Sequence, residues 1–473
     1  MPSALHRSWR YGLLVLTPAV IITWLLQNGP TPIATAAVGE LARSAAADVT
    51  SSVAQPSSTF ALGQLVLQLI VVLVAARGCG VLAKRLGQPA VIGEMFAGIA
   101  LGPSILGAWL PAVSAQVFPA GSLAFLNALS QVGVLLFLFV VGLHVDLSAL
   151  RRQSGTAVIA SHASIAAPFT MGVALAHLLF PVFAPAGIPF TAFALFVGVA
   201  MSVTAFPVLA RILEERHLLD TPIGSLAVAC AAVDDVTAWI LLTVVVAIVK
   251  SAGLSAELLT TLGGTAAFLA IMFGVVRPLL HRWNARLSHA APSASVSVSP
   301  LSLLIILALL AALVTESVGI HALFGAFVAG TVVPRGHGLA DRTARQLGDL
   351  LVVLLLPLFF AYTGLRTDLR AITGVSELGA LAAVLAVAIA GKVGGTAIAA
   401  RSSGQDWHSA TTLGILMNTR GLMELVVLNI GLDLGVLSPA LFGIMVIMAL
   451  VTSAMTVPAL SLMTRFAPSR AVG

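Results

Sequence analysis

Long apolar runs, each with the length of a membrane-crossing helix, follow one another along nearly the whole sequence. A helix needs about 20 apolar residues to cross the hydrocarbon core of a bilayer. Charged residues make up only 9% of the 473 residues, whereas a soluble domain carries about 25%. The sequence therefore predicts an all-α polytopic membrane protein. The fourteen predicted spans are residues 11–27, 61–83, 89–107, 123–143, 156–180, 190–212, 222–249, 256–277, 301–316, 319–334, 348–365, 377–400, 408–431 and 439–463.

The basic residues predict the orientation of these spans. With the N-terminus in the cytoplasm, eighteen of the 24 Lys and Arg residues fall on the inner side and four on the outer side, as the positive-inside rule requires. This bias accounts for the net charge of +6, so no nucleic-acid partner is expected. The protein is expected in the plasma (inner) membrane, with its C-terminus in the cytoplasm.

Three stretches of chain are distinguished. Residues 1–60 form a first span or a cleaved signal peptide, followed by a polar loop, so that thirteen or fourteen spans remain. Residues 61–463 form the membrane domain, and residues 464–473 form a short cytoplasmic tail.

Two short motifs recur along the sequence. Gly142–Leu147 resembles Gly364–Leu369, and Gly93–Gly98 resembles Gly325–Gly330. In both matches the second copy lies seven spans after the first. Because consecutive spans cross the membrane in opposite directions, this odd separation places the second copy upside down. The pattern predicts two inverted six-helix repeats, an arrangement typical of secondary transporters. The alternative is that small-residue patterns recur in any membrane helix bundle.

Two adjacent carboxylates, Asp234 and Asp235, lie in the middle of the span 222–249. Each ionised side chain at that depth costs about 2.5–3.5 kcal/mol, so such residues are usually functional. Burial and like charge both oppose full ionisation of the pair. The pair is therefore suited to holding either a proton or a monovalent cation. No catalytic residue and no cofactor is predicted.

Two spans carry polar interruptions near mid-membrane. Ser202 and Thr204 precede Pro207, which removes one backbone donor and disturbs the preceding turn. The corresponding span of the second half contains Asn418, Thr419, Arg420 and Glu424. Two discontinuous helices at corresponding positions indicate a transporter binding site. The alternative for the first span is a kinked but continuous helix.

Lys392 is the only lysine inside a predicted span. A buried lysine needs a carboxylate partner or loses its proton. We expect Asp234 to be that partner, which leaves Asp235 as the main ion ligand. Arg420 and Glu424 are four residues apart on one helix face and are expected to pair.

These residues together resemble the cation:proton antiporter-2 family, which includes bacterial sodium/proton and potassium/proton antiporters and plant cation/proton exchangers. The segments that carry the resemblance are Gly93–Pro103, Phe137–Asp146, Thr204–Arg211, Asp234–Asp235, Phe359–Asp368 and Asn418–Gly431. The motif that begins at Asn418 is most similar to the plant branch.

The resemblance implies a homodimer of sodium/hydrogen exchanger fold. A six-helix core, expected at about residues 123–249 and 348–463, would carry the ion by an elevator-like movement against a dimerisation scaffold. It further implies that Asp235 binds the ion and the proton. The transported cation would lie at Asp235, Asp234 and Thr204, with Lys392 as the supporting charge.

The sequence thus favours a secondary antiporter, not an enzyme, that exchanges sodium or potassium for protons. An ion-coupled symporter or a channel on the same scaffold is the alternative. Intramembrane aspartyl proteases also use two buried aspartates, but they carry them on separate helices beside Tyr-Asp and Gly-Leu-Gly-Asp. This chain has only Gln346–Asp349 at a span boundary and no Tyr-Asp.

Overall fold

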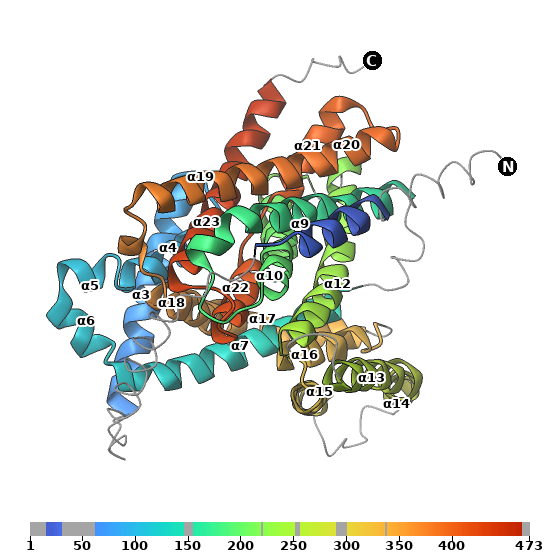
Figure 1. The fold of residues 1–473 in the computed structure, drawn as a ribbon. Coiled ribbons are helices and arrows are strands. Elements are labelled where there is room, and N and C mark those ends of the chain that lie inside the picture. The colour runs from blue at the N-terminus through green and yellow to red at the C-terminus, as the bar shows by residue number, and fades with distance from the viewer. Residues whose placement is uncertain are drawn as a thin grey trace.

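The computed structural model describes residues 16–30, 62–145, 155–218, 221–250, 256–289, 300–335 and 338–465. Within these ranges every regular element is a helix (Figure 1). Ten of the described helices are long and apolar enough to cross a membrane, and Trp407–Met417 with Leu422–Asp433 forms a further span bent by 46°. The polytopic all-helical fold predicted from the sequence is confirmed.

The predicted span 319–334 is shorter than expected, since its helix covers only Ala322–Thr331, and the predicted span 190–212 is divided into Phe190–Ser202 and Phe206–Glu215. A helix rises 1.5 Å per residue, so the 10 residues of Ala322–Thr331 extend about 15 Å, half the hydrocarbon thickness. Most of the predicted polar loop and of the predicted tail lies outside the described residues.

The described helices form two groups that pack mainly within themselves. We call them the scaffold helices and the core helices. The scaffold helices are α3 (Leu62–Arg85), α4 (Ala90–Leu101), α5 (Leu106–Trp109), α6 (Pro111–Val117), α7 (Leu123–His144), α13 (Ala256–Ile271), α14 (Arg277–His289), α15 (Pro300–Ser317), α16 (Ala322–Thr331), α17 (Leu339–Leu350) and α18 (Leu356–Leu365). The core helices are α9 (Gly155–Phe183), α10 (Phe190–Ser202), α11 (Phe206–Glu215), α12 (Pro222–Lys250), α19 (Val375–Ile389), α20 (Gly395–Ser402), α21 (Trp407–Met417), α22 (Leu422–Asp433) and α23 (Pro439–Arg465).

This grouping differs from the core ranges expected at residues 123–249 and 348–463. Those ranges include α7 and α18, whereas α7 packs chiefly against α16, and α18 packs against α4 and α7. We therefore place α7, α17 and α18 with the scaffold helices.

Glycines bring pairs of scaffold helices into close contact. A Cβ atom at Gly98 of α4 would lie 2.1 Å from the carbonyl oxygen of Phe360 in α18. A Cβ atom at Gly142 of α7 would lie 2.2 Å from the carbonyl oxygen of Phe327 in α16. Small residues allow such close backbone approach in membrane bundles. These glycines belong to the two recurring motifs, so the contacts agree with the inverted repeat, which stays a prediction.

A π-helical segment, η6 (Ala390–Gly394), joins α19 to α20 and carries Lys392. A Cβ atom at Gly391 would lie 2.8 Å from Cα of Pro168, which lies inside α9. π-Helical bulges rotate the following side chains and are frequent at functional sites. Here the bulge fixes how Lys392 is presented to α9 and α12.

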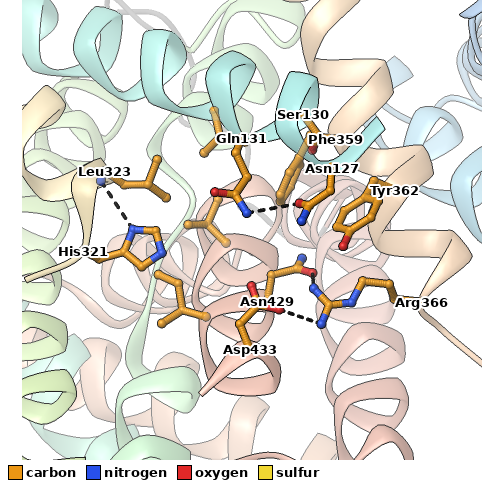
Figure 2. Close-up of a pocket in the computed structure, with 13 residues that line it drawn as sticks. Asn127, Ser130, Gln131, His321, Leu323, Phe359, Tyr362, Arg366, Asn429 and Asp433 are labelled. Atoms are coloured by element: carbon orange, nitrogen blue, oxygen red, sulfur yellow. Dashed lines mark hydrogen bonds and ion pairs between the residues drawn. The ribbon is translucent and has the colours of Figure 1, made fainter. Parts of the chain in front are cut away.

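Two cavities lie near opposite ends of α12. The larger, about 390 Å³, lies beside the start of α12 and is lined by residues that include Ala157, Ala229 and Ser409. The smaller, about 30 Å³, lies where α22 of the core meets α7, α16 and α18 of the scaffold (Figure 2).

Candidate functional site

The site begins where two core spans are interrupted. The helix α10 ends at Ser202 and α11 begins at Phe206, and Val203 between them is extended with φ −67° and ψ 138°. The second break separates α21, which ends at Met417, from α22, which begins at Leu422, and its last residue, Gly421, adopts φ 158°, a backbone conformation that L side chains rarely adopt. Both predicted discontinuities are therefore present among the described residues.

The two breaks cross and are bonded to each other. The backbone N–H of Ala205 donates to the carbonyl oxygen of Thr419 at 2.9 Å. The hydroxyl of Thr204 lies 3.4 Å from the carbonyl oxygen of Met417. Interrupted helices leave backbone groups without partners inside the helix, and each break here satisfies part of the other.

Arg420 caps the C-terminal end of α10. Its guanidinium donates to the carbonyl oxygen of Ala200 at 3.0 Å and to that of Met201 at 2.5 Å. It also forms the predicted ion pair with Glu424, at 2.8 Å. The C-terminal end of a helix carries partial negative charge on its free carbonyls. The buried guanidinium of Arg420 is therefore well placed there.

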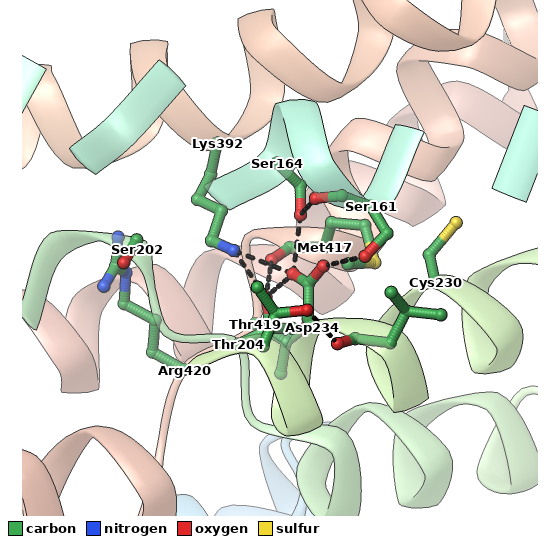
Figure 3. Close-up of polar contacts among 12 residues, drawn as sticks. Ser161, Ser164, Ser202, Thr204, Cys230, Asp234, Lys392, Met417, Thr419 and Arg420 are labelled. Atoms are coloured by element: carbon green, nitrogen blue, oxygen red, sulfur yellow. Dashed lines mark hydrogen bonds and ion pairs between the residues drawn. The ribbon is translucent and has the colours of Figure 1, made fainter. Parts of the chain in front are cut away.

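Asp234 is surrounded by hydrogen-bond donors (Figure 3). Ser161 and Ser164 of α9 donate to its two carboxylate oxygens, each at 2.5 Å. Thr204 donates to Oδ2 at 2.8 Å, and Lys392 lies 3.1 Å from the same oxygen. The predicted pairing of Lys392 with Asp234 is present, and both side chains are fully buried.

Lys392 also donates to the hydroxyl of Thr204, at 2.6 Å. Thr204 therefore connects the lysine, the carboxylate of Asp234 and the second break. This single hydroxyl on the interrupted segment joins three core spans, α10–α11, α12 and α19–α20.

Asp235 has a different environment from its neighbour. It is only 1% exposed, and neither carboxylate oxygen has a hydrogen-bond partner among the described residues. A buried charge without a partner is costly. Asp235 is therefore the carboxylate of this site with both oxygens available to a proton or a cation, whereas Asp234 has none and Glu424 has only Oε1.

The charges of the site balance in pairs, with one remaining. Asp234 pairs with Lys392 and Glu424 pairs with Arg420. Asp235 is the remaining charged group of the five, and all of them are buried. One positive charge at Asp235 would neutralise the site.

Other predicted site residues lie at the breaks without touching the carboxylates. Ser202 donates to the carbonyl oxygen of Val199 within its own helix, at 2.8 Å. Thr419 donates to the carbonyl oxygen of Leu416, at 2.7 Å. The side-chain oxygen of Asn418 is buried and has no hydrogen-bond partner in the described part of the chain. It is a neutral oxygen that a cation could use.

Ser161 and Ser164 were not predicted. Both are fully buried in α9, and their spacing of three residues places them on one helix face. That spacing alone does not single them out, because hydroxyls in apolar helices usually bond to their own backbone.

The larger cavity ends close to this cluster. Its lining residue Ala157 accepts a hydrogen bond from the thiol of Cys230, at 3.5 Å, and Cys230 lies one helical turn before Asp234. Ala229, also in the lining, is five residues before Asp234, about 7.5 Å along the helix. The cavity thus reaches to within about two turns of the carboxylates.

Comparison with known sequences and structures places this geometry in a family. A profile described as "Sodium/hydrogen exchanger, transmembrane" matches residues 69–464. The chain is 40% identical over 397 residues to the Na(+)/H(+) antiporter NhaS4 of Synechocystis sp., covering 83% of this chain and 95% of that protein.

Longer eukaryotic proteins match as well. Cation/H(+) antiporter 18 of Arabidopsis thaliana is 41% identical over 415 residues, which are 87% of this chain and 50% of the plant protein. K(+)/H(+) antiporter 1 of Saccharomyces cerevisiae is 33% identical over 376 residues, which are 78% of this chain and 43% of the yeast protein. The chain spans about half the length of these two relatives.

Among solved structures, the sodium proton antiporter MjNhaP1 of Methanocaldococcus jannaschii matches with a TM-score of 0.62 and 15% identity. The match covers 85% of this chain and 99% of that structure. At this identity the match shows the fold alone. The profile and the relatives together show that the chain belongs to the sodium/hydrogen exchanger family of membrane transport proteins.

Proposed function

We propose that this protein is a secondary active antiporter that exchanges a monovalent cation, sodium or potassium, for protons. The observation that carries the proposal is the contrast between two adjacent carboxylates. Asp234 accepts hydrogen bonds from four side chains, whereas Asp235 is equally buried and accepts none among the described residues.

Competition at Asp235 is the proposed mechanism. A proton and a cation each supply the one positive charge that the five buried charged groups lack. When either binds, the other is excluded, because a second charge would again leave the site unbalanced in a low-dielectric environment. The transport of a cation in one direction is therefore coupled to the transport of a proton in the opposite direction.

The cation would also need neutral oxygens. Thr204 and the amide oxygen of Asn418 lie at the crossing of the two breaks, together with backbone carbonyls that an intact helix could not offer. Asp234 can contribute an oxygen only when one of its four donors moves away. We therefore assign Asp235 as the principal ligand, and Asp234 with Lys392 as the neighbouring charge pair.

The protein is an integral membrane protein of a transporter family. We propose its membrane, the side of its C-terminus and its oligomeric state. The plasma membrane is supported by the resemblance to bacterial antiporters, and a cytoplasmic C-terminus by the distribution of Lys and Arg residues. A homodimer in contact with lipid fits the exposed apolar surface of α3 and α13, where Leu62, Ile70, Val74 and Leu259 are more than half exposed. The core helices would carry the site, and the scaffold helices would form the fixed part.

The test uses proteoliposomes with an acidic lumen and a trapped pH indicator. Addition of lithium, sodium, potassium or rubidium in turn should alkalinise the lumen and rank the ions. Asp235→Asn should abolish the response. The matched control is Asp349→Asn, the same change at an exposed carboxylate of α17, which should leave the rate unchanged.

Each alternative has its own outcome in this assay. Exchange by Asp235→Asn at the parent rate would overturn the site assignment. Cation uptake without proton release would indicate a channel. A response that requires an added organic solute would indicate a symporter.

A further inference from the structure

A polar network joins the core helices to the scaffold helices at the smaller cavity (Figure 2). Arg366 follows α18 of the scaffold, and its guanidinium lies 2.7 Å from the carboxylate of Asp433 in α22 of the core. The same guanidinium donates to the side-chain oxygen of Asn429, at 3.2 Å. The amide nitrogen of Asn429 donates back to the scaffold, to the hydroxyl of Thr363 at 2.9 Å.

Another contact joins the two groups at the same end. Lys250, the last residue of α12 in the core, donates to the carbonyl oxygen of Gly319 of the scaffold, at 3.2 Å. His321, which lines the smaller cavity, lies within electrostatic reach of both Lys250 and Asp433. The contacts therefore gather on the face that the distribution of Lys and Arg residues predicts to be outer.

The cavity that they border is small. Its volume of about 30 Å³ is far below the 390 Å³ of the cavity at the start of α12, and it has room for about one water molecule. Ser130 of α7 lines it and is 1% exposed, with a hydroxyl that has no hydrogen-bond partner among the described residues. At this volume the cavity is too narrow to admit a hydrated ion.

The network is connected rigidly to the ion site. The helix α22 begins after the second break, carries Glu424 in its first turn and continues to Asp433. These two residues are about 13.5 Å apart along one helix. Any displacement of the crossing relative to the scaffold must therefore move Asp433 and Asn429 relative to Arg366 and Thr363.

We propose that Arg366, Asn429 and Asp433 form a latch that fastens the core to the scaffold and holds the protein closed on the predicted outer face. The latch must open for Asp235 to reach that face. The inference rests on the proposed function for the movement of the core, but the latch itself is defined by contacts in the structure. The side chains of Arg366 and Asp433 are 22% and 46% exposed, and ion pairs at such exposure are weak enough to open reversibly.

The test measures opening directly. In a Cys79→Ser, Cys230→Ser background, Ser130→Cys places a thiol in the wall of the cavity. A membrane-impermeant maleimide, added to the full-length protein in oriented vesicles from the predicted outer face, reports how often the passage opens. Asp433→Asn and Arg366→Gln should each raise the labelling rate about fivefold, the ratio expected from loss of a half-exposed ion pair.

A matched control lies on the same face. Asp368 pairs with Arg370 at 2.9 Å, two residues along the chain, so this pair does not join the core to the scaffold. Asp368→Asn should leave the labelling rate unchanged. The double variant Arg366→Gln, Asp433→Asn should label no faster than either single variant, because both changes remove the same contact.

The latch is overturned if labelling of Ser130→Cys is equal in the parent and in both latch variants, with folding verified by elution as a single species. It is also overturned if Asp368→Asn accelerates labelling equally. Labelling needs no transport, so the two proposals can fail separately. Faster labelling in a protein without cation/proton exchange would keep the latch and reject the antiporter. Normal exchange with unchanged labelling would keep the antiporter and reject the latch.

Discussion

Two identical side chains, adjacent in sequence and equally buried, have opposite surroundings in this protein. The carboxylate of Asp234 is held by two serines, a threonine and a lysine. The carboxylate of Asp235 is held by none of the described side chains. Successive residues of a helix point about 100° apart. One helix can therefore place a hydrogen-bonded carboxylate against one neighbour and a carboxylate without partners against another.

The serines should matter to stability as well as to transport. The double variant Ser161→Ala, Ser164→Ala removes two hydrogen bonds to a buried charged group, each worth about 1.5–3 kcal/mol. We expect a clear fall in the melting temperature of the purified protein, measured in detergent. Ser202→Ala is the control, since among the described residues its hydroxyl bonds to a carbonyl oxygen of its own helix. Equal melting temperatures for the double variant and the control would show that Lys392 and Thr204 alone hold Asp234.

At this scale the sequence predicted the charges better than the hydroxyls. The pairing of Lys392 with Asp234 was predictable because a buried lysine requires a carboxylate. The serines were not, because a hydroxyl in an apolar helix usually bonds to its own backbone. Thr237 and Thr243 in the same helix as Asp234 do so, and no local pattern separates them from Ser161 and Ser164.

At the scale of single elements, the two half-helices depend on one arginine. Arg420 satisfies the last carbonyls of α10, the carboxylate of Glu424 and, through its backbone, the hydroxyl of Ser453 in α23. Its planar guanidinium holds its N–H donors in a rigid fork, so that it reaches two carbonyl oxygens and a carboxylate at once, whereas the donors of a lysine all lie on one nitrogen. The first break is thus stabilised by a residue of the second.

Loss of this cation should be severe. Arg420→Gln leaves a buried carboxylate without its partner, and breaking a buried pair costs about 3–5 kcal/mol. We expect low yield and a strongly lowered melting temperature, and Arg420→Lys should not restore either. The double variant Arg420→Gln, Glu424→Gln should recover part of the loss, because it removes the unpaired charge. If Arg420→Gln melted like the parent, the guanidinium would not be the cap of α10.

The elements were predicted unevenly from the sequence. Pro207 correctly marked the first break, but it lies in the first turn of α11, where its missing N–H costs nothing, and the interruption precedes it at residues 203–205. The π-helical segment that carries Lys392 could not be predicted. Its Gly391 packs closely against Pro168 of another helix, a contact that no local pattern contains.

At the scale of the whole molecule, glycines of the recurring motifs determine how closely the scaffold helices approach. Gly142→Ala would place a methyl group 2.2 Å from a backbone oxygen of α16, so the helices must separate. We expect a loss of stability of roughly 1–3 kcal/mol, the usual cost of overpacking, measured by thermal unfolding. Gly348→Ala in α17 is the control, because its added Cβ atom meets nothing within 4 Å. If both variants unfolded alike, the close approach of α7 and α16 would be wrong.

The division into scaffold and core was the least predictable feature. The helices α7 and α18 are as hydrophobic as the core spans, and a sequence gives no sign of which helix a given apolar face will contact. The packing is determined by glycine contacts between residues more than 180 positions apart, such as Gly142 with Phe327. Fold class, by contrast, follows from span length alone, because only closed hydrogen-bonding structures cross a bilayer.

The coupling of two ions at one buried site makes a prediction for the protein as a whole. If a proton and a cation compete for Asp235, the free fraction of the site falls about tenfold for each unit of pH below the range where it titrates, and the apparent affinity falls with it. The cation concentration that gives half-maximal exchange in proteoliposomes should therefore rise with a slope of about one against falling pH on logarithmic axes. A slope near two would mean that Asp234 also takes up a proton and releases Lys392. No dependence on pH would mean that the two ions bind at separate sites, which contradicts exchange by competition.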